Sequence, residues 1–304
     1  TEQLQSFAMS TRLGIPLLIG LDAVHGMSKA DDAVFFPHNI GLGCSGDLDL
    51  VQRVGRITAL EMAGCGVNWT FTPTIAAARD IRWGRTYECF TETPNLAGSM
   101  GTAFTLGLQD GALGNSATSV LGCAKHYAGD GATTGGVNAG DVPLDEPTFR
   151  RLCVDQYRPV VDAGVGSIMA SYNSWNGELL HGHDYLITDV LKGELGFQGI
   201  VVSDWNGIDS LPGDRRADVI DAVTAGLDMF MLAGSYVEFI DTLISVADGA
   251  QLAMSRVDDA VRRILTIKCE MGLFEPGYTG AVDPTLTAEV GSAEHRTVGR
   301  EAVS

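Results

Sequence analysis

Short apolar runs alternate with longer amphipathic segments along most of this chain, and this alternation is the feature that most constrains its fold. We expect strands at residues 16–21, 67–71, 119–124, 166–170, 199–202 and 227–231. Helices are expected at residues 48–62, 95–108, 146–163, 187–195, 217–225, 237–247 and 255–271. Repeated strand–helix units form parallel sheets, and this many units in about 270 residues favour a closed (β/α) barrel over an open sheet. No glycine-rich phosphate loop follows a strand at the required spacing, which weakens an open dinucleotide-binding fold.

The barrel pattern covers residues 1–273, and residues 274–304 differ from it. Residues 274–284 carry glycine and proline and are typical of a linker, whereas residues 283–304 begin a new unit. The chain has 304 residues, opens inside a helical pattern without a methionine, and closes just after another helical pattern. We therefore expect a piece of a longer protein, with a second domain continuing after the linker.

The charge of the chain limits its partners. Acidic residues outnumber basic ones by 38 to 20, for a net charge of −18, so a phosphate backbone or an anionic membrane surface would be repelled. No apolar run is long enough to span a membrane. None of the six cysteines has a partner at metal-binding spacing; buried thiols are favoured, and one or two disulfides stay open. We expect no metal and no cofactor.

Polar side chains recur where the expected strands end. They are Asp22, Lys125 with His126, Tyr172, and Asp204 with Trp205. In a parallel barrel all these strand ends open on one face, so the residues would meet in one pocket. Taken singly, each has a plainer explanation: Asp204 as a helix cap with Trp205 in the core, and Lys125–His126 as a surface ion pair. Because all of these residues stand at strand ends, one shared functional site is favoured over the separate structural explanations.

A loop after the second expected strand adds further charge. Residues 82–88 hold two arginines, two aromatic residues and Glu88. A guanidinium is a rigid fork suited to hydroxyl or carboxylate recognition, so Arg85 is a candidate ligand-binding residue. The alternative is an ion-pair network that ties the loop together, and both can hold at once.

Several longer motifs now carry a resemblance. In chain order they are GLDAVHG (20–26), FPHNIGL (36–42), RDIRWGR (79–85), AKHY (124–127), MASYNSWNG (169–177) and SDW (203–205). Together they resemble the catalytic barrel of glycoside hydrolase family 3, which contains β-glucosidases and exo-acting β-glucan hydrolases. The similarity runs from Gly14 to Ser304. It implies an incomplete TIM-type barrel, because the first strand of the family would lie before Thr1, followed by a second α/β domain.

The resemblance also implies roles for the residues at the strand ends. Asp204 matches the nucleophile of a retaining mechanism, which forms a glycosyl-enzyme that water then hydrolyses. The positions that match those holding the non-reducing-end glucosyl unit are Asp22, Arg85, Lys125, His126 and Tyr172, and Trp205 lines the sugar face. The general acid/base of two-domain relatives comes from the second domain, which lies outside this chain.

Some residues depart from the family pattern. Ala63 stands where many relatives carry arginine, and Thr91–Glu92–Thr93 where an acid commonly follows the glutamate. The branch that uses a barrel-loop histidine as acid/base has a second histidine after its Lys-His pair, and residues 127–131 contain none. This difference argues against that N-acetylglucosaminidase branch.

The function expected is that of an exo-acting β-glucosidase that releases terminal non-reducing β-D-glucosyl residues from a β-glucoside or β-glucan oligosaccharide. The resemblance implies a periplasmic or secreted location. Two alternatives stay open: a truncated, non-catalytic barrel that only binds sugar, and a Schiff-base lyase that uses Lys125. Residues 1–304 alone are expected to be inactive and poorly stable, because a barrel that lacks a strand exposes an edge and an apolar interior.

Overall fold

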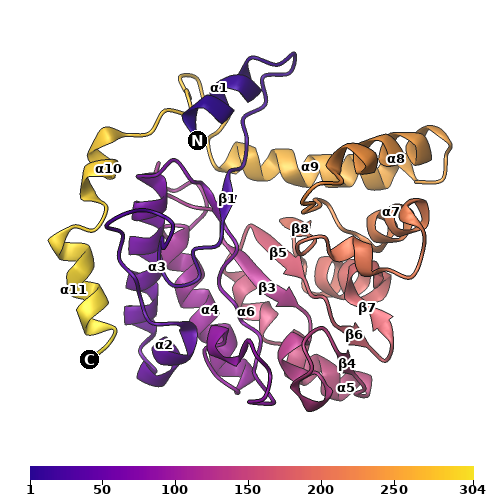
Figure 1. The fold of residues 1–304 in the computed structure, drawn as a ribbon, viewed down its shortest axis with the longest axis horizontal. Coiled ribbons are helices and arrows are strands. Elements are labelled where there is room, and N and C mark those ends of the chain that lie inside the picture. Colours follow the sequence, from indigo (N-terminus) through magenta and orange to yellow (C-terminus); the bar gives the residue numbers. More distant parts are fainter.

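The computed structural model describes residues 1–304, and its barrel strands all run in one direction around a partly closed barrel (Figure 1). The barrel strands are β1 (Gly20–Leu21), β2 (Trp69–Thr70), β3 (Cys123–Tyr127), β5 (Ser167–Ala170) and β8 (Ile200–Val202). A separate small sheet beside the barrel contains β4 (Asp141–Val142), β6 (Ser174–Trp175) and β7 (Glu178–Leu179).

Helices and helical turns cover the outside of the barrel. The helices are α1 (Glu2–Met9), α2 (Asn39–Ser45), α3 (Leu48–Ala63), α4 (Pro94–Leu108), α5 (Glu146–Phe149), α6 (Tyr157–Asp162), α7 (Arg215–Ala225), α8 (Tyr236–Asp248), α9 (Met254–Glu270), α10 (Pro284–Glu289) and α11 (Ala293–Glu301). Shorter or wider turns are η1 (Thr86–Glu88), η2 (Asp130–Ala132), η3 (Thr134–Gly136), η4 (Arg150–Val154), η5 (Leu180–Gly182), η6 (Tyr185–Glu194) and η7 (Gly207–Ser210). Aspartates cap several of them; the Asp47 carboxylate, for example, accepts the Leu50 N–H at 3.0 Å.

Parallel pairing passes from one strand to the next around the barrel. β1 pairs with β2, and β3, β5 and β8 pair in that order. A single bridge from Trp69 to Leu121 joins β2 to the segment that leads into β3, and a bridge from Val202 to Met229 extends the series beyond β8. No pairing joins the Met229 segment back to β1, so the barrel stays open at this seam.

The expected strands are confirmed in order, with shifted boundaries. The strand expected at residues 119–124 lies instead at Cys123–Tyr127, because the Lys125 N–H donates to the Pro73 carbonyl and the Lys125 carbonyl accepts from Ile75. The strand expected at 227–231 is only a bridge at Met229. The helix expected at 146–163 is broken by the π-helical turn η4. Pro159 has no backbone N–H to continue an α-helical ladder there.

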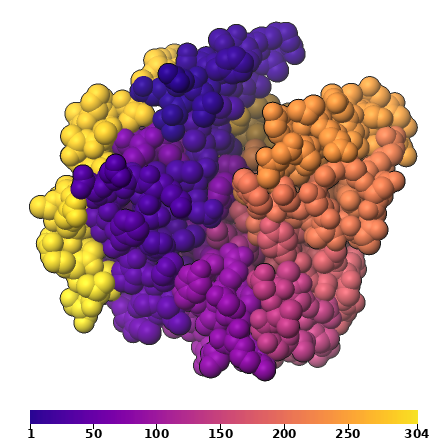
Figure 2. All heavy atoms as spheres, in the orientation of Figure 1, coloured from indigo at the N-terminus to yellow at the C-terminus, as the bar shows by residue number.

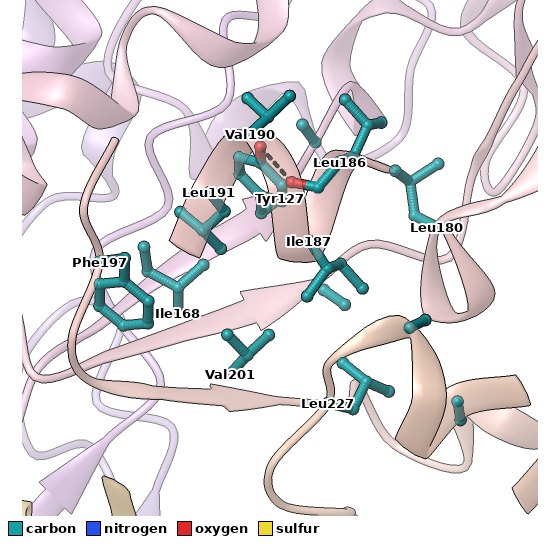
Figure 3. Packing of buried hydrophobic residues seen from close by; sticks show 14 of the residues in the cluster. Tyr127, Ile168, Leu180, Leu186, Ile187, Val190, Leu191, Phe197, Val201 and Leu227 are labelled. Carbon is teal, nitrogen blue, oxygen red and sulfur yellow. Dashed lines mark hydrogen bonds between the residues drawn. The ribbon is translucent and has the colours of Figure 1, made fainter. Parts of the chain in front are cut away.

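Side chains on each strand alternate between two cores. Ile168 and Val201 point outward against η6, where Ile187 and Leu191 pack on them (Figure 3). Met169, Ile200 and Val202 point inward and join Trp69 and Cys123 in the barrel interior. This alternation follows from the two-residue repeat of a strand. Each fully buried aliphatic side chain contributes roughly 1.5–3 kcal/mol, so the outer layer stabilises the barrel strongly.

Helix α9 partly covers the open seam of the barrel. Ile264 and Ile267 of α9 pack against the interior cluster, together with the half-buried Leu18, Met229 and Met231 beside the seam. In the space-filling view a notch separates the N-terminal segment from the lobe formed by α8 (Figure 2). The apolar interior is therefore covered by a helix where a further strand would otherwise close the barrel.

Candidate active site

Asp204 lies two residues after the end of β8 and presents one unpartnered carboxylate oxygen. Its Oδ1 accepts the N–H of Trp205 at 2.6 Å, which fixes the carboxylate against its own turn. Its Oδ2 is buried, has no hydrogen-bond partner, and lies 3.6 Å from Nε2 of His126. A carboxylate held through one oxygen and free at the other has the form required of a nucleophile.

Arg85 lies beside this carboxylate and is held by Glu88. The Arg85 guanidinium donates from Nε to Glu88 Oε1 at 2.7 Å and from a terminal nitrogen to Oε2 at 2.8 Å. Burial alone would lower the pKa of Arg85, but the hydrogen bonds and charge of Glu88 raise it above its ordinary value. The ion-pair explanation of the 82–88 loop is confirmed. The same ion pair places a cation near Asp204, and ligand recognition by Arg85 stays a prediction.

His126 is a buried, neutral imidazole whose tautomer follows from its neighbours. A terminal nitrogen of Arg85 lies 3.0 Å from Nε2 of His126, and a guanidinium can only donate, so Nε2 is the acceptor. The ring proton is therefore on Nδ1 and is donated to Asp130 Oδ2 at 2.7 Å. Burial, then the charges of Arg85 and Lys125, lower the pKa of His126. Burial raises the pKa of Asp130.

Lys125 joins two distant strands at the same face. Its Nζ donates to Asp22 Oδ1 at 2.9 Å, and its side chain is only 5% exposed whereas that of Asp22 is 60% exposed. Lys125 and His126 lie inside β3 rather than after it, as a correction to the sequence interpretation. Because the ladder continues through these polar residues, Lys125 and His126 are fixed by a strand and not by a loop.

Tyr172 and Trp205 form the rim. The Tyr172 hydroxyl donates to the Trp205 carbonyl, and burial together with the charge of Asp204 raises the pKa of this hydroxyl. The Trp205 side chain is 57% exposed. The alternative of a core tryptophan is therefore wrong, and an open aromatic face is available next to Asp204.

The structure thus brings the predicted residues together, in two linked groups. Lys125 pairs with Asp22, whereas Arg85, His126 and Tyr172 lie near Asp204. Sequence reasoning missed Asp130 and His181. Asp130 stands four residues after His126, a spacing that could have indicated a pair, but no sequence pattern links His181 to Asp204. All six cysteines are free thiols.

Two further findings concern metal ligands and membrane-spanning helices. No cluster of three or more histidine, cysteine or acidic side chains could hold a metal ion. No helix in the structure is long and apolar enough to cross a membrane.

A barrel whose strand ends gather carboxylates, cations and a neutral imidazole belongs to the class of (β/α)-barrel proteins with their reactive groups at the carboxyl ends of the strands. The family profile described as the glycosyl hydrolase family 3 N terminal domain matches residues 1–267. The chain belongs to this family.

Solved structures and curated relatives agree with this assignment. The chain resembles the exo-1,3/1,4-beta-glucanase of a Pseudoalteromonas species with a TM-score of 0.93 and 39% identity, over 99% of this chain and 38% of that one. It resembles the Listeria innocua beta-glucosidase in complex with glucose with a TM-score of 0.88 and 29% identity, over 98% of this chain and 41% of that one. It is 35% identical to the periplasmic beta-glucosidase of Salmonella typhimurium, over 99% of this chain and 40% of that protein. The chain therefore spans about two fifths of the length of these relatives.

Proposed function

We propose that this chain is the nucleophile-bearing barrel of a retaining, exo-acting β-glucosidase. Asp204 attacks the anomeric carbon of a terminal non-reducing β-D-glucosyl residue, and water then hydrolyses the glycosyl-enzyme with retention. The observation that carries the proposal is the unpartnered, buried Oδ2 of Asp204, which faces Arg85 and His126 rather than a structural partner.

The neighbouring polar groups suit a sugar. Asp22 accepts hydroxyl protons, whereas Lys125 and Arg85 donate to hydroxyl oxygens. His126 lines the pocket with a neutral ring whose Nε2 accepts from Arg85, and the Trp205 face packs against the pyranose ring. A pocket that pairs each hydroxyl discriminates strongly, because a missing hydroxyl leaves a buried group unpaired. The Listeria innocua enzyme has been solved with glucose and with laminaribiose, which agrees with a glucosyl subsite and an oligosaccharide substrate.

The general acid/base is proposed to lie outside residues 1–304. Every other carboxylate near Asp204 already has a partner: Glu88 is held by Arg85, Asp130 by His126, and Asp22 by Lys125. A general acid must be free to give its proton to the leaving oxygen. A domain that follows the linker at residues 274–304 is therefore the proposed source, and residues 1–304 alone are expected to bind sugar without turnover.

The Schiff-base alternative has less support. An amine nucleophile is activated by an apolar pocket or by another cation. Lys125 instead has the carboxylate of Asp22 at 2.9 Å, an arrangement suited to a charged hydrogen-bond donor. Borohydride trapping with a carbonyl substrate would detect a Lys125 adduct if this alternative were correct.

A mechanism-based label tests the main proposal. The full-length polypeptide is incubated with a 2-deoxy-2-fluoroglucoside, digested and analysed by mass spectrometry. The label is expected on the peptide that contains Asp204, and a label on another residue would refute the assignment. Asp204→Ala is expected to abolish turnover, and added azide to restore part of it with formation of the α-glucosyl azide.

A periplasmic or secreted location is proposed on the resemblance alone. The Salmonella typhimurium and Dickeya chrysanthemi relatives carry the word periplasmic in their names. Cell fractionation with activity measured in each fraction would test this location.

A further inference from the structure

The hydrogen-bond ladder that builds β8 stops just before the candidate nucleophile. β5 and β8 pair as far as Met169 and Val202. The next N–H, of Ser203, faces away from β5 and donates to the Met229 carbonyl at 3.0 Å. The amide of Asp204 therefore faces the β5 side, where no carbonyl of the ladder receives it. It donates instead to Nε2 of His181, at 3.0 Å.

His181 is fixed in place for this contact. It lies in η5, is fully buried, and packs with its ring centroid 5.6 Å from that of Tyr172. Gly207 presses on the other side, since a Cβ added there would lie 2.0 Å from Nε2 of His181. Only glycine permits this approach of the turn after Asp204 to the imidazole.

Packing alone does not explain the histidine at position 181, because its imidazole has a buried nitrogen without a hydrogen-bond partner. Because Nε2 accepts from Asp204, the proton of the neutral ring is on Nδ1, and this buried atom has no partner. Burial lowers the pKa of His181 to about 4, so the ring is neutral in ordinary conditions. An unpaired buried N–H destabilises a fold. An apolar side chain of this size would avoid that cost, and it would also lose the acceptor for Asp204.

Other hydrogen bonds hold the backbone on both sides of the Asp204 amide. Trp205 offers its carbonyl to Tyr172, and the Asn206 N–H donates to the Met231 carbonyl at 2.8 Å. His181 is the contact that holds the Asp204 amide itself, whereas the Asp204 carbonyl accepts the Gly207 N–H at 2.9 Å. The Asp204 N–H belongs to the 203–204 peptide, so a tilt of this peptide in the absence of its acceptor would move the Asp204 Cα and turn Oδ2 away from its target.

We propose that His181 is a positioning residue that orients Asp204 for attack through its Nε2 acceptor. The inference rests on the proposed function, since it assigns a role in nucleophilic attack. His181 contacts the Asp204 backbone and none of the proposed sugar-binding side chains except the ring of Tyr172. Its loss is therefore expected to slow the formation of the glycosyl-enzyme while leaving ground-state sugar binding nearly unchanged.

Two substitutions in the full-length polypeptide separate the acceptor from the ring. His181→Phe keeps the ring volume without an acceptor, and His181→Gln supplies an amide oxygen acceptor without the ring. The readouts are the limiting rate of labelling by the 2-deoxy-2-fluoroglucoside, its apparent dissociation constant, and the thermal unfolding midpoint. His181→Phe is expected to reduce the limiting rate roughly 10- to 100-fold, the range for a small misplacement of a reacting group. His181→Gln is expected to recover most of that loss, although it packs less well.

His183→Phe is the matched control. His183 is also buried and stacks on Trp175, but its charged neighbour is Glu178 and it makes no contact with Asp204. The control is expected to label at the wild-type rate. If His181→Phe labels as fast as wild type, or if His181→Gln is slowed as much as His181→Phe, the positioning role is wrong. A wild-type protein labelled at a residue other than Asp204 would instead refute the proposed function, so the two failures are distinct.

Discussion

Replacement of Asp130 by asparagine tests whether the tautomer of His126 matters. Asp130 is buried, its Oδ2 accepts the Nδ1–H of His126 at 2.7 Å, and its Oδ1 accepts the Gly131 N–H at 3.1 Å. An amide has one oxygen. The NH₂ group of the Asp130→Asn side chain would therefore face either the Gly131 N–H or the Nδ1–H of His126, and both are donors. The conflict with His126 is relieved only if its proton moves to Nε2. That proton would then face the Arg85 guanidinium, 3.0 Å away.

The expected loss can be estimated from these contacts. A buried donor left without an acceptor costs about 1–3 kcal/mol, and removal of the buried carboxylate returns part of this, since burial raises the pKa of Asp130. We expect Asp130→Asn to lower the free energy of unfolding by about 1–2 kcal/mol. A disturbed His126–Arg85 contact of similar size would lower kcat/KM roughly tenfold.

The assay compares variants of the full-length polypeptide on an aryl β-glucoside at alkaline pH, where the Asp130 carboxylate is ionised. Because burial raises the pKa of Asp130 to about 7, the folded chain binds this proton more tightly than the unfolded chain, so the stability of wild type relative to Asp130→Asn should increase as the pH falls from about 7 to about 4. Asp145→Asn is the control: Asp145 caps α5 at the surface, and asparagine caps a helix equally well. Wild-type kcat/KM and unfolding midpoint in Asp130→Asn at alkaline pH would refute the reasoning.

Two further expectations concern buried charged or titratable groups. Lys125→Ala removes the donor paired with Asp22 and should lower kcat/KM by the equivalent of about 2–4 kcal/mol, measured with an aryl β-glucoside; a near-wild-type value would remove Lys125 from the site. The lowered pKa of His181, about 4, means that the unfolded chain gains its proton first as the pH falls. Wild type should therefore lose up to about 3 kcal/mol of stability between pH ~6.5 and ~4 relative to His181→Gln. Thermal midpoints across this range check the trend, and parallel curves would contradict it.

The order of strands and the gathering of polar strand ends could be predicted from the sequence, because apolar runs and the parallel barrel together decide both. Asp204 follows β8 as expected, and Lys125 reaches Asp22 across the barrel face. The bounds of β3 could not be predicted, because an apolar run indicates which residues are buried and not where a hydrogen-bond ladder begins and ends. The hydrogen-bond ladder of β3 continues through Lys125 and His126, whose side chains can be buried there because each pairs with a polar neighbour.

The contacts made by His181 were beyond sequence reasoning for a different reason. Its partner, the Asp204 amide, lies 23 residues along the chain and is reached only because η5 packs against η7. A side chain that accepts from a backbone amide leaves no mark in the spacing or type of the residues. The break in the expected 146–163 helix, by contrast, had a visible cause in Pro159.

The residues after the barrel do not form a loose tether. In Figure 1 α10 and α11 run along the outer side of α3. The fully buried carboxylate of Glu61 in α3 accepts the Gly291 N–H and contacts His295 Nδ1, each at 2.9 Å. Arg53 of α3 also donates to the Glu301 carboxylate through both of its terminal guanidinium nitrogens. A flexible linker would let an attached domain search a wide volume, with an effective concentration set by linker length. Here the residues from which a following domain would extend, 291–301, are held against α3. In the proposed two-domain arrangement, the catalytic acid would therefore approach Asp204 from one preset direction, and mutations at Glu61 would change activity from a distance.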